Sequence, residues 1–252
     1  WIDNESIVDI YKEFTNTENL SYLDLPAILY LMIKLDGKKA SKEIKHIVID
    51  EAQDYSMLQF IVLKELTGCK SYTIVGDSNQ RLIKVEEEPA MLKLKSLFGG
   101  FVKNYALNKS YRSTFQIMEY ASKLLDENAI VPFVRKGKFD VEEVEVKDED
   151  DLIDTILETL EDYDNIAIIT KDKEELKKIA PELKKFTKLL AFDREDVIYR
   201  GGKVIVPSYY AKGLEFDGVI IVNFDDNTDD LVKYIMATRA LHRLKVVNYR
   251  RW

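Results

Sequence analysis

The sequence contains one cysteine and two histidines in 252 residues. Cys69 has no second cysteine to pair with, so an internal disulfide is excluded, and the lack of a Cys/His cluster argues against a zinc site. Because a lone free thiol is typical of proteins in a reducing compartment, we expect a cytoplasmic protein.

No apolar run is long enough to cross a membrane. The most apolar stretch, Leu25–Leu35, is far shorter than the ~20 residues of a membrane span, and Lys34 interrupts it. We expect an amphipathic core helix there and no membrane contact. The first residues, WIDNESIVDIYKEF, have no initiator methionine and no basic region followed by an apolar run, so a targeting peptide is not predicted. We expect that the chain starts inside a longer protein.

Positive charge is also in deficit. The chain has 45 acidic and 37 basic side chains, which gives a net charge of -8 and a pI near 5.1. Since nucleic-acid binders are usually basic as a whole, any contact with nucleic acid must come from a local groove.

Helical and β-branched segments alternate along the chain. Helices are predicted at 20–35, 57–66, 89–97, 113–125, 149–160, 173–184 and 229–240. Strands are predicted at 46–50, 72–75, 101–106, 141–146, 165–169, 203–206, 217–222 and 244–248. This alternation predicts an α/β fold with parallel sheets covered by helices. We expect a boundary near residues 103–110, which gives two lobes, 1–104 and 105–252.

Two helix starts carry an S-x-x-Q pattern: Ser56 with Gln59, and Ser113 with Gln116. In such a capping box the hydroxyl and the amide satisfy backbone N–H groups of the first turn. The run FDVEEVEVKDEDDLIDTILETLEDYD is acidic, yet its apolar residues keep strand and then helix spacing, so it predicts a solvated acidic face.

Two adjacent acids, Asp50 and Glu51, follow the predicted strand in HIVIDEAQDYS. Ligands of open α/β sheets bind outside the carboxyl ends of the strands, so these acids are expected to face a crevice. One carboxylate could hold Mg²⁺ while the other activates a water for phosphoryl transfer. The alternative is that both only solubilise the strand end, while Asp54 and Ser56 cap the next helix. These residues by themselves leave both interpretations open.

Further segments follow in a fixed order: VIDEAQD, TIVGDSNQ, LNKSYRST, PSYYAKGLEFDGVII and YIMATRA. This series resembles motifs II to VI of the superfamily 1 helicases of the UvrD/Rep type. VIDEAQDYS and PSYYAKGLEFD are most similar to the HelD group, bacterial helicase-like factors that associate with RNA polymerase. The resemblance implies two RecA-like (P-loop NTPase) lobes with parallel sheets, the first incomplete at its N-terminus.

In the first lobe, the resemblance implies that Asp50 binds Mg²⁺ and that Glu51 is the catalytic base. It gives Gln80 the role of sensing the γ-phosphate of ATP, with Asp77 bracing it. Without the resemblance, Gln80 would be interpreted as a turn residue.

In the second lobe, the resemblance implies that Tyr111 stacks on the adenine and that Arg112 reaches the γ-phosphate. Glu215 would accept from the ribose hydroxyl, Gly213 would form a tight turn, and Lys212 would support that loop or a phosphate. Taken alone, these residues would be a packing pair and a polar hairpin.

Arg239 in ATRA matches the arginine finger of motif VI, which spreads its charge over the developing phosphoryl oxygens. Helical spacing would place Arg239 and Arg243 on one face, so a plain surface helix is the alternative.

Two features depart from the family pattern. No G-x-x-x-x-G-K-[ST] loop is present, and DGKKAS at 36–41 lacks the upstream glycine, so we predict that this chain alone neither binds ATP tightly nor hydrolyses it. After Gln80 the chain reads RLIKVEEEP, without the aromatics on which a base would stack, unless Tyr209 or Tyr210 replaces them.

The first hypothesis is therefore the motor portion of a HelD-like, ATP- and Mg²⁺-dependent DNA helicase or translocase that moves on nucleic acid or remodels RNA polymerase complexes. The alternatives are a UvrD-type repair helicase and a non-catalytic module that docks on RNA polymerase or DNA.

Overall fold

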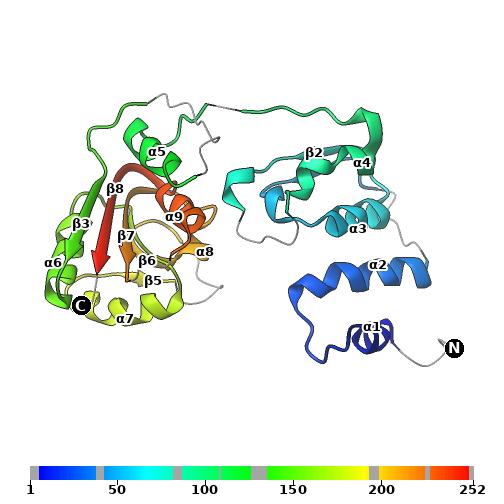
Figure 1. Cartoon of the computed structure of the whole chain (residues 1–252), viewed down its shortest axis with the longest axis horizontal. Helices are drawn as coiled ribbons and strands as arrows, with labels where there is room; N and C mark the ends of the chain where they lie inside the picture. The colour runs from blue at the N-terminus through cyan, green and yellow to red at the C-terminus, as the bar shows by residue number, and fades with distance from the viewer. Residues whose placement is uncertain are drawn as a thin grey trace. The chain divides into compact units, whose positions relative to one another are not determined.

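The computed structural model describes residues 6–37, 43–81, 87–107, 109–125, 135–192, 199–224 and 228–249. The chain divides into two compact units, Trp1–Asn104 (unit 1) and Tyr105–Trp252 (unit 2). Both units contain a parallel sheet with helices against it, so the predicted α/β class, as expected for RecA-like lobes, is confirmed (Figure 1).

Unit 1 is built around two short parallel strands. They are β1 (Ile47–Ile49) and β2 (Tyr72–Ile74), paired with Ile47 opposite Tyr72 and Ile49 opposite Ile74. The helices of unit 1 are α1 (Ile7–Thr15), η1 (Tyr22–Asp24), α2 (Leu25–Leu35), η2 (Ala52–Asp54), α3 (Met57–Thr67), η3 (Ser78–Gln80), η4 (Ala90–Lys93), α4 (Lys95–Phe98) and η5 (Gly99–Phe101).

The core of unit 1 lies between the strands, α3 and the η4–α4 segment. Its buried members are Ile49, Ala52, Phe60, Ala90 and Leu94. Because Ile49 and Ala52 flank the acids at 50 and 51, this core fixes both ends of the segment that carries the acids.

Unit 2 holds a six-stranded sheet with strand order β3-β8-β7-β4-β6-β5, and every adjacent pair is parallel. Its strands are β3 (Glu142–Val146), β4 (Ile166–Thr170), β5 (Leu190–Ala191), β6 (Lys203–Pro207), β7 (Phe216–Asn223) and β8 (Ala240–Tyr249). Its helices are α5 (Phe115–Ser122), α6 (Glu149–Leu160), α7 (Lys173–Leu183), α8 (Ser208–Ala211) and α9 (Asp230–Ala237).

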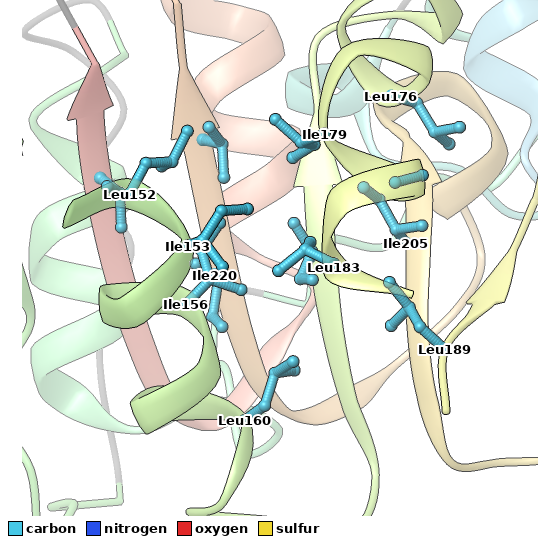
Figure 2. Close-up of a cluster of buried hydrophobic side chains, with 14 of the residues drawn as sticks. Leu152, Ile153, Ile156, Leu160, Leu176, Ile179, Leu183, Leu189, Ile205 and Ile220 are labelled. Atoms are coloured by element: carbon cyan, nitrogen blue, oxygen red, sulfur yellow. The ribbon is translucent and has the colours of Figure 1, made fainter. Parts of the chain in front are cut away.

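Helices cover both faces of this sheet. Figure 2 shows α6 and α7 packing leucine and isoleucine side chains, among them Ile156 and Leu183, onto Ile205 and Ile220 of the strands. Helices α5, α8 and α9 pack against the sheet as well (Figure 1). All five residues of β4 are buried, which is why its sequence is apolar throughout instead of alternating.

The acidic run forms a strand and a helix, as its spacing predicts. These elements are β3 and α6. The Asp148 side chain accepts from Asp151 N at 2.9 Å and caps the helix. Three acidic residues in the first turn also stabilise α6, because their negative charges lie at the positive, N-terminal end of the helix dipole.

The two capping-box predictions had different outcomes. At α3 the box is confirmed: Ser56 Oγ accepts from Gln59 N at 3.3 Å, and Gln59 Oε1 accepts from Ser56 N at 2.7 Å. At α5 it is wrong, because the N-cap is Thr114. Ser113 Oγ instead donates to Ala240 O at 2.7 Å, which ties the start of α5 to β8.

Three other predicted elements differ from the observed ones. The predicted strand at 101–106 is a 3-10 turn, η5, followed by irregular backbone, and Phe101, Tyr105 and Leu107 are exposed with no strand to pair with. The predicted helix at 89–97 is split into η4 and α4. Helix α9 ends at Ala237 because Ala240 pairs with Phe216 and starts β8.

Within the described residues, no helix is sufficiently long and apolar to span a membrane.

Candidate functional site

The chain segments that follow β1 and β2 are tied together in unit 1. Val75 N donates to Ile49 O at 2.8 Å, and Ala52 N donates back to Val75 O at 3.0 Å. Because the two strands are parallel, residues 50–54 and 76–80 emerge at the same edge of the sheet. The predicted acids and the predicted sensor loop are thus brought together.

Asp50 and Glu51 are both exposed at this edge. Glu51 has φ 51° and ψ 36°, and in the described part of the chain only Asn16 also combines a side chain with positive φ. A left-handed conformation is uncommon for a residue other than glycine and is maintained only where the surroundings enforce it. It turns the chain sharply directly after Asp50, whose Oδ1 accepts from Glu51 N at 2.8 Å.

Asp77 and Gln80 form the second part of the edge. Asp77 Oδ1 accepts from Asn79 N at 2.9 Å and caps the η3 turn, while Asp77 Oδ2 accepts from Gln80 Nε2 at 2.9 Å. The expected bracing contact is therefore present. Gln80 is 9% exposed, so its side chain is held by its surroundings and does not move freely in solvent.

Gln53 joins the two parts, a role that was not predicted from the sequence. Its Nε2 donates to Glu51 Oε2 at 2.6 Å, and its Oε1 accepts from Asp77 N at 3.0 Å. The one available signal was its position in DEAQD, where a polar residue follows a buried alanine. Gln53 itself is buried, at 1% exposure.

In unit 2, Arg112 contacts two segments that are distant in sequence. Its Nη1 donates to Glu215 Oε1 at 3.1 Å, and its Nη2 donates to Thr238 O at 2.9 Å. Phe216 N donates to Arg239 O at 3.0 Å, so the segments before β7 and β8 are paired here. The structure thus gathers the predicted residues Arg112, Glu215 and Arg239 at the amino ends of two adjacent strands.

Arg239 is buried at 1% exposure. Its Nε donates to Ile235 O at 3.0 Å and its Nη2 donates to Thr238 Oγ1 at 3.2 Å. The proposed shared helical face with Arg243 is wrong, because Arg239 follows α9 and Arg243 lies within β8. A strand turns its residues to alternate faces, which helical spacing does not describe.

Of the other predicted residues, Tyr111 precedes α5, and Tyr209 and Gly213 lie between β6 and β7. Tyr111 is 64% exposed, so its ring is available for stacking. Gly213 has φ 79°, which a glycine adopts without strain. Tyr209 is partly exposed and stacks edge-on with Tyr210 at 4.6 Å, and partial burial raises the pKa of the Tyr209 phenol, so the phenol is neutral at physiological pH.

A magnesium ion is compatible with Asp50. Its Oδ1 accepts one hydrogen bond, which leaves Oδ2 for an ion or for a water bound to one. Mg²⁺ usually takes one or two carboxylates and fills its other positions with waters and substrate phosphates. No group of three or more His, Cys, Asp or Glu side chains within the described ranges is arranged to hold a metal.

Comparison with known proteins bears on the unit that carries the acids. Residues 3–83 match the UvrD/REP helicase N-terminal domain. The matched region includes Asp50, Glu51 and Gln80. The UvrD/Rep resemblance is therefore supported for unit 1 by the match itself.

Individual relatives of the UvrD/Rep type are similar to this chain at low identity. The ATP-dependent DNA helicase Rep of Buchnera aphidicola is 27% identical over 166 residues, which is 60% of this chain and 24% of the relative. Rep of Escherichia coli is 29% identical over 106 residues, 41% of this chain and 16% of the relative. The chain spans about a quarter or less of the length of these relatives.

Among solved structures, the C-terminal domain of a possible DNA helicase from Lactobacillus plantarum is 27% identical. The similarity covers 56% of this chain and 88% of that domain, with a TM-score of 0.47.

Proposed function

We propose that this chain is the motor portion of an ATP-dependent DNA helicase or translocase of the UvrD/Rep type. The observation that carries the proposal is the edge of unit 1, where Asp50 and Glu51 follow one parallel strand and Asp77 and Gln80 follow its neighbour. The match of residues 3–83 to the UvrD/REP helicase N-terminal domain supports it.

In this proposal, unit 1 supplies the acid–base and metal chemistry. Asp50 would hold Mg²⁺, and the ion would neutralise charge on the phosphates. Glu51 takes a proton from the attacking water as the water oxygen bonds to the γ-phosphorus and the bond to the β-phosphate oxygen breaks, releasing ADP and phosphate. Gln80 contacts the γ-phosphate and reports its loss.

Unit 2 supplies the groups that recognise nucleotide and stabilise charge. Tyr111 stacks on the adenine and Glu215 accepts from the ribose. Arg112 and Arg239 would donate to phosphoryl oxygens, where a guanidinium stabilises the developing charge better than a lysine does. For the buried Arg239 this requires the side chain to leave its bonds to Ile235 O and Thr238 Oγ1. Lys212 and Gly213 shape the loop that presents Glu215.

The chain described here lacks the glycine-rich loop and lysine that cradle the β- and γ-phosphates. We therefore propose that the 252 residues alone neither bind ATP tightly nor hydrolyse it, and that activity requires the full-length protein. Titration with a fluorescent ATP analogue tests this. Binding with a dissociation constant of about 1 µM, which equals the low end of the usual range of enzyme KM values, would contradict it.

The experiment for the function is ATP turnover by the full-length protein. Glu51→Gln keeps the shape of the side chain and removes the base, so it should reduce turnover by about 10²–10⁴-fold while nucleotide binding is retained. Glu158→Gln, on the exposed face of α6, is the matched control and should leave turnover unchanged. Unchanged turnover in Glu51→Gln would remove Glu51 from the site.

Within this function, we propose a HelD-like translocase that remodels RNA polymerase complexes. The sequences VIDEAQDYS and PSYYAKGLEFD and the absence of stacking aromatics after Gln80 favour this over processive unwinding. ATP turnover stimulated by RNA polymerase would support it. Duplex unwinding independent of the polymerase would favour a UvrD-type repair helicase, and polymerase binding without any turnover would indicate a non-catalytic docking module.

A further inference from the structure

Gln53 occupies a position between the proposed base and the proposed sensor. Its amide bonds to Glu51 Oε2 at 2.6 Å on one side and to Asp77 N at 3.0 Å on the other. Asp77 in turn accepts from Gln80 Nε2 at 2.9 Å. One continuous set of hydrogen bonds therefore runs from Glu51 through Gln53 and Asp77 to Gln80, entirely within unit 1.

We propose that Gln53 is a positioning residue that holds the Glu51 carboxylate and the Asp77–Gln80 turn in one fixed arrangement. The inference rests on the proposed function, since it assigns Gln53 to the same site. Gln53 touches neither nucleotide nor metal in this account and acts through Glu51 and Asp77.

Only a primary amide satisfies both neighbours. Glu51 presents a carboxylate oxygen, which accepts, and Asp77 presents a backbone N–H, which donates. An amide meets them with its NH₂ and its carbonyl oxygen respectively, so the orientation of the amide is determined by its partners. A carboxylate at this position would have an acceptor facing Glu51, and an aliphatic side chain would satisfy neither group.

The space around Gln53 is as restrictive as its chemistry. The side chain is 1% exposed, so water cannot replace a lost partner. At Gly76 an added Cβ would lie 2.7 Å from Gln53 Oε1, 3.0 Å from Gln53 N and 2.7 Å from Met91 Sδ. The absence of a side chain at Gly76 therefore leaves the room in which the Gln53 amide reaches Asp77.

The backbone of Glu51 explains why a support is needed. Its left-handed conformation, φ 51° and ψ 36°, is not one that an exposed glutamate adopts by preference. The bond from Gln53 Nε2 fixes where that side chain points. Its neighbours in sequence include the acids Asp50 and Asp54, and a neutral donor such as the Gln53 amide adds no repulsion.

The decisive variant is Gln53→Glu, which conserves size and the acceptor for Asp77 N. The substitution replaces the donor that faces Glu51 Oε2 with a second acceptor, so the Glu51 carboxylate loses the bond that fixes its direction. In the full-length protein we expect kcat for ATP to fall by about 10-fold or more at pH 7, with a smaller change in KM. Lys70→Gln changes the net charge by the same amount at the amino end of β2 and should leave both unchanged.

A second measurement needs no variant and no turnover. In the 252-residue chain, the side-chain amide protons of wild-type Gln53 should exchange with solvent far more slowly than those of exposed amides, because the side chain is buried and hydrogen-bonded. Rapid exchange, measured by NMR, would overturn the proposal even if Gln53→Glu failed to fold.

The outcomes separate the inference from the function it rests on. Unchanged turnover in Glu51→Gln would defeat the proposed function. Loss of turnover in Glu51→Gln, together with wild-type kcat and KM in Gln53→Glu, would defeat the positioning role and leave the function standing.

Discussion

The guanidinium of Arg112 donates to the carboxylate of Glu215 across 103 positions of sequence, at 3.1 Å. Both side chains are substantially exposed, at 38% and 48%. An ion pair so exposed stabilises a fold by no more than about 1 kcal/mol. The pair is therefore better explained by the proposed nucleotide site than by stability.

Glu215→Gln separates these two explanations. We expect the free energy of unfolding to change by less than about 1 kcal/mol. In the full-length protein, loss of a charged acceptor for the ribose should lower kcat/KM for ATP by roughly 10- to 100-fold, since hydrogen bonds to charged groups contribute about 1.5–3 kcal/mol. Urea denaturation and steady-state ATPase kinetics measure the two quantities. A large loss of stability with unchanged kinetics would reverse the assignment.

The capping box of α3 supports the segment that follows the acids. Ser56→Ala removes the acceptor for Gln59 N and should cost about 1 kcal/mol. We expect the α3 amides to exchange with deuterium roughly 5-fold faster, because 1 kcal/mol corresponds to about that factor. Ser96→Ala is the control, since its exposed hydroxyl donates only to Lys93 O. Equal exchange in both variants would show that the box contributes nothing.

The core under α6 and α7 buries a large set of apolar side chains in unit 2. Leu183 is fully buried and Leu190 is 41% exposed. We expect Leu183→Ala to lower the free energy of unfolding by about 2–5 kcal/mol through lost burial and the cavity left behind. Leu190→Ala should cost less than about 1 kcal/mol. Similar losses in chemical denaturation would mean that the two sites are not packed as described.

Stability should depend on pH through Glu142. The hydrogen bond from Arg243, with Nη2 to Oε1 at 2.9 Å, lowers the pKa of the Glu142 carboxyl, and Lys245 adds to the effect. A lowered pKa in the folded state gives stability that is present above the ordinary value of 4.5 and is lost as the pH falls through the folded-state value.

Glu142→Gln removes that contribution. Because the side chain is 47% exposed, the loss at pH 7 should be only about 0.5–1 kcal/mol. The difference from wild type should shrink as the pH falls well below 4.5, the ordinary pKa of the carboxyl. Thermal unfolding at pH 7 and pH 3 measures this, with Glu158→Gln as the control. A difference that grows toward pH 3 would contradict the sign of the pKa shift.

Elements with strong local signals were predictable from the sequence. α6 has an N-cap, an acidic first turn and a regular apolar face, and its predicted bounds match the observed ones. The predicted strand at 101–106 is absent, because a strand also requires a neighbouring strand and the exposed apolar residues there have none.

The same distinction applies to the candidate site. Asp50 and Glu51 were visible because a buried strand that ends in acids is unusual. Gln53 was not, because its importance depends on Asp77 N, which a second strand brings beside it. Arg239 was predicted to lie on a helix, because the local spacing of apolar residues carries no information about the pairing of Ala240 with Phe216.

We propose that Glu51 of unit 1 and Arg239 of unit 2 both contribute to ATP turnover by the full-length protein. A double-mutant cycle of ATP turnover with Glu51→Gln and Arg239→Lys in the full-length protein tests it most directly. We predict that the double variant is no slower than the slower single variant, because groups that serve one step are not additive. A double variant whose rate loss equals the product of the two single losses would show that the two residues act independently and would contradict the account.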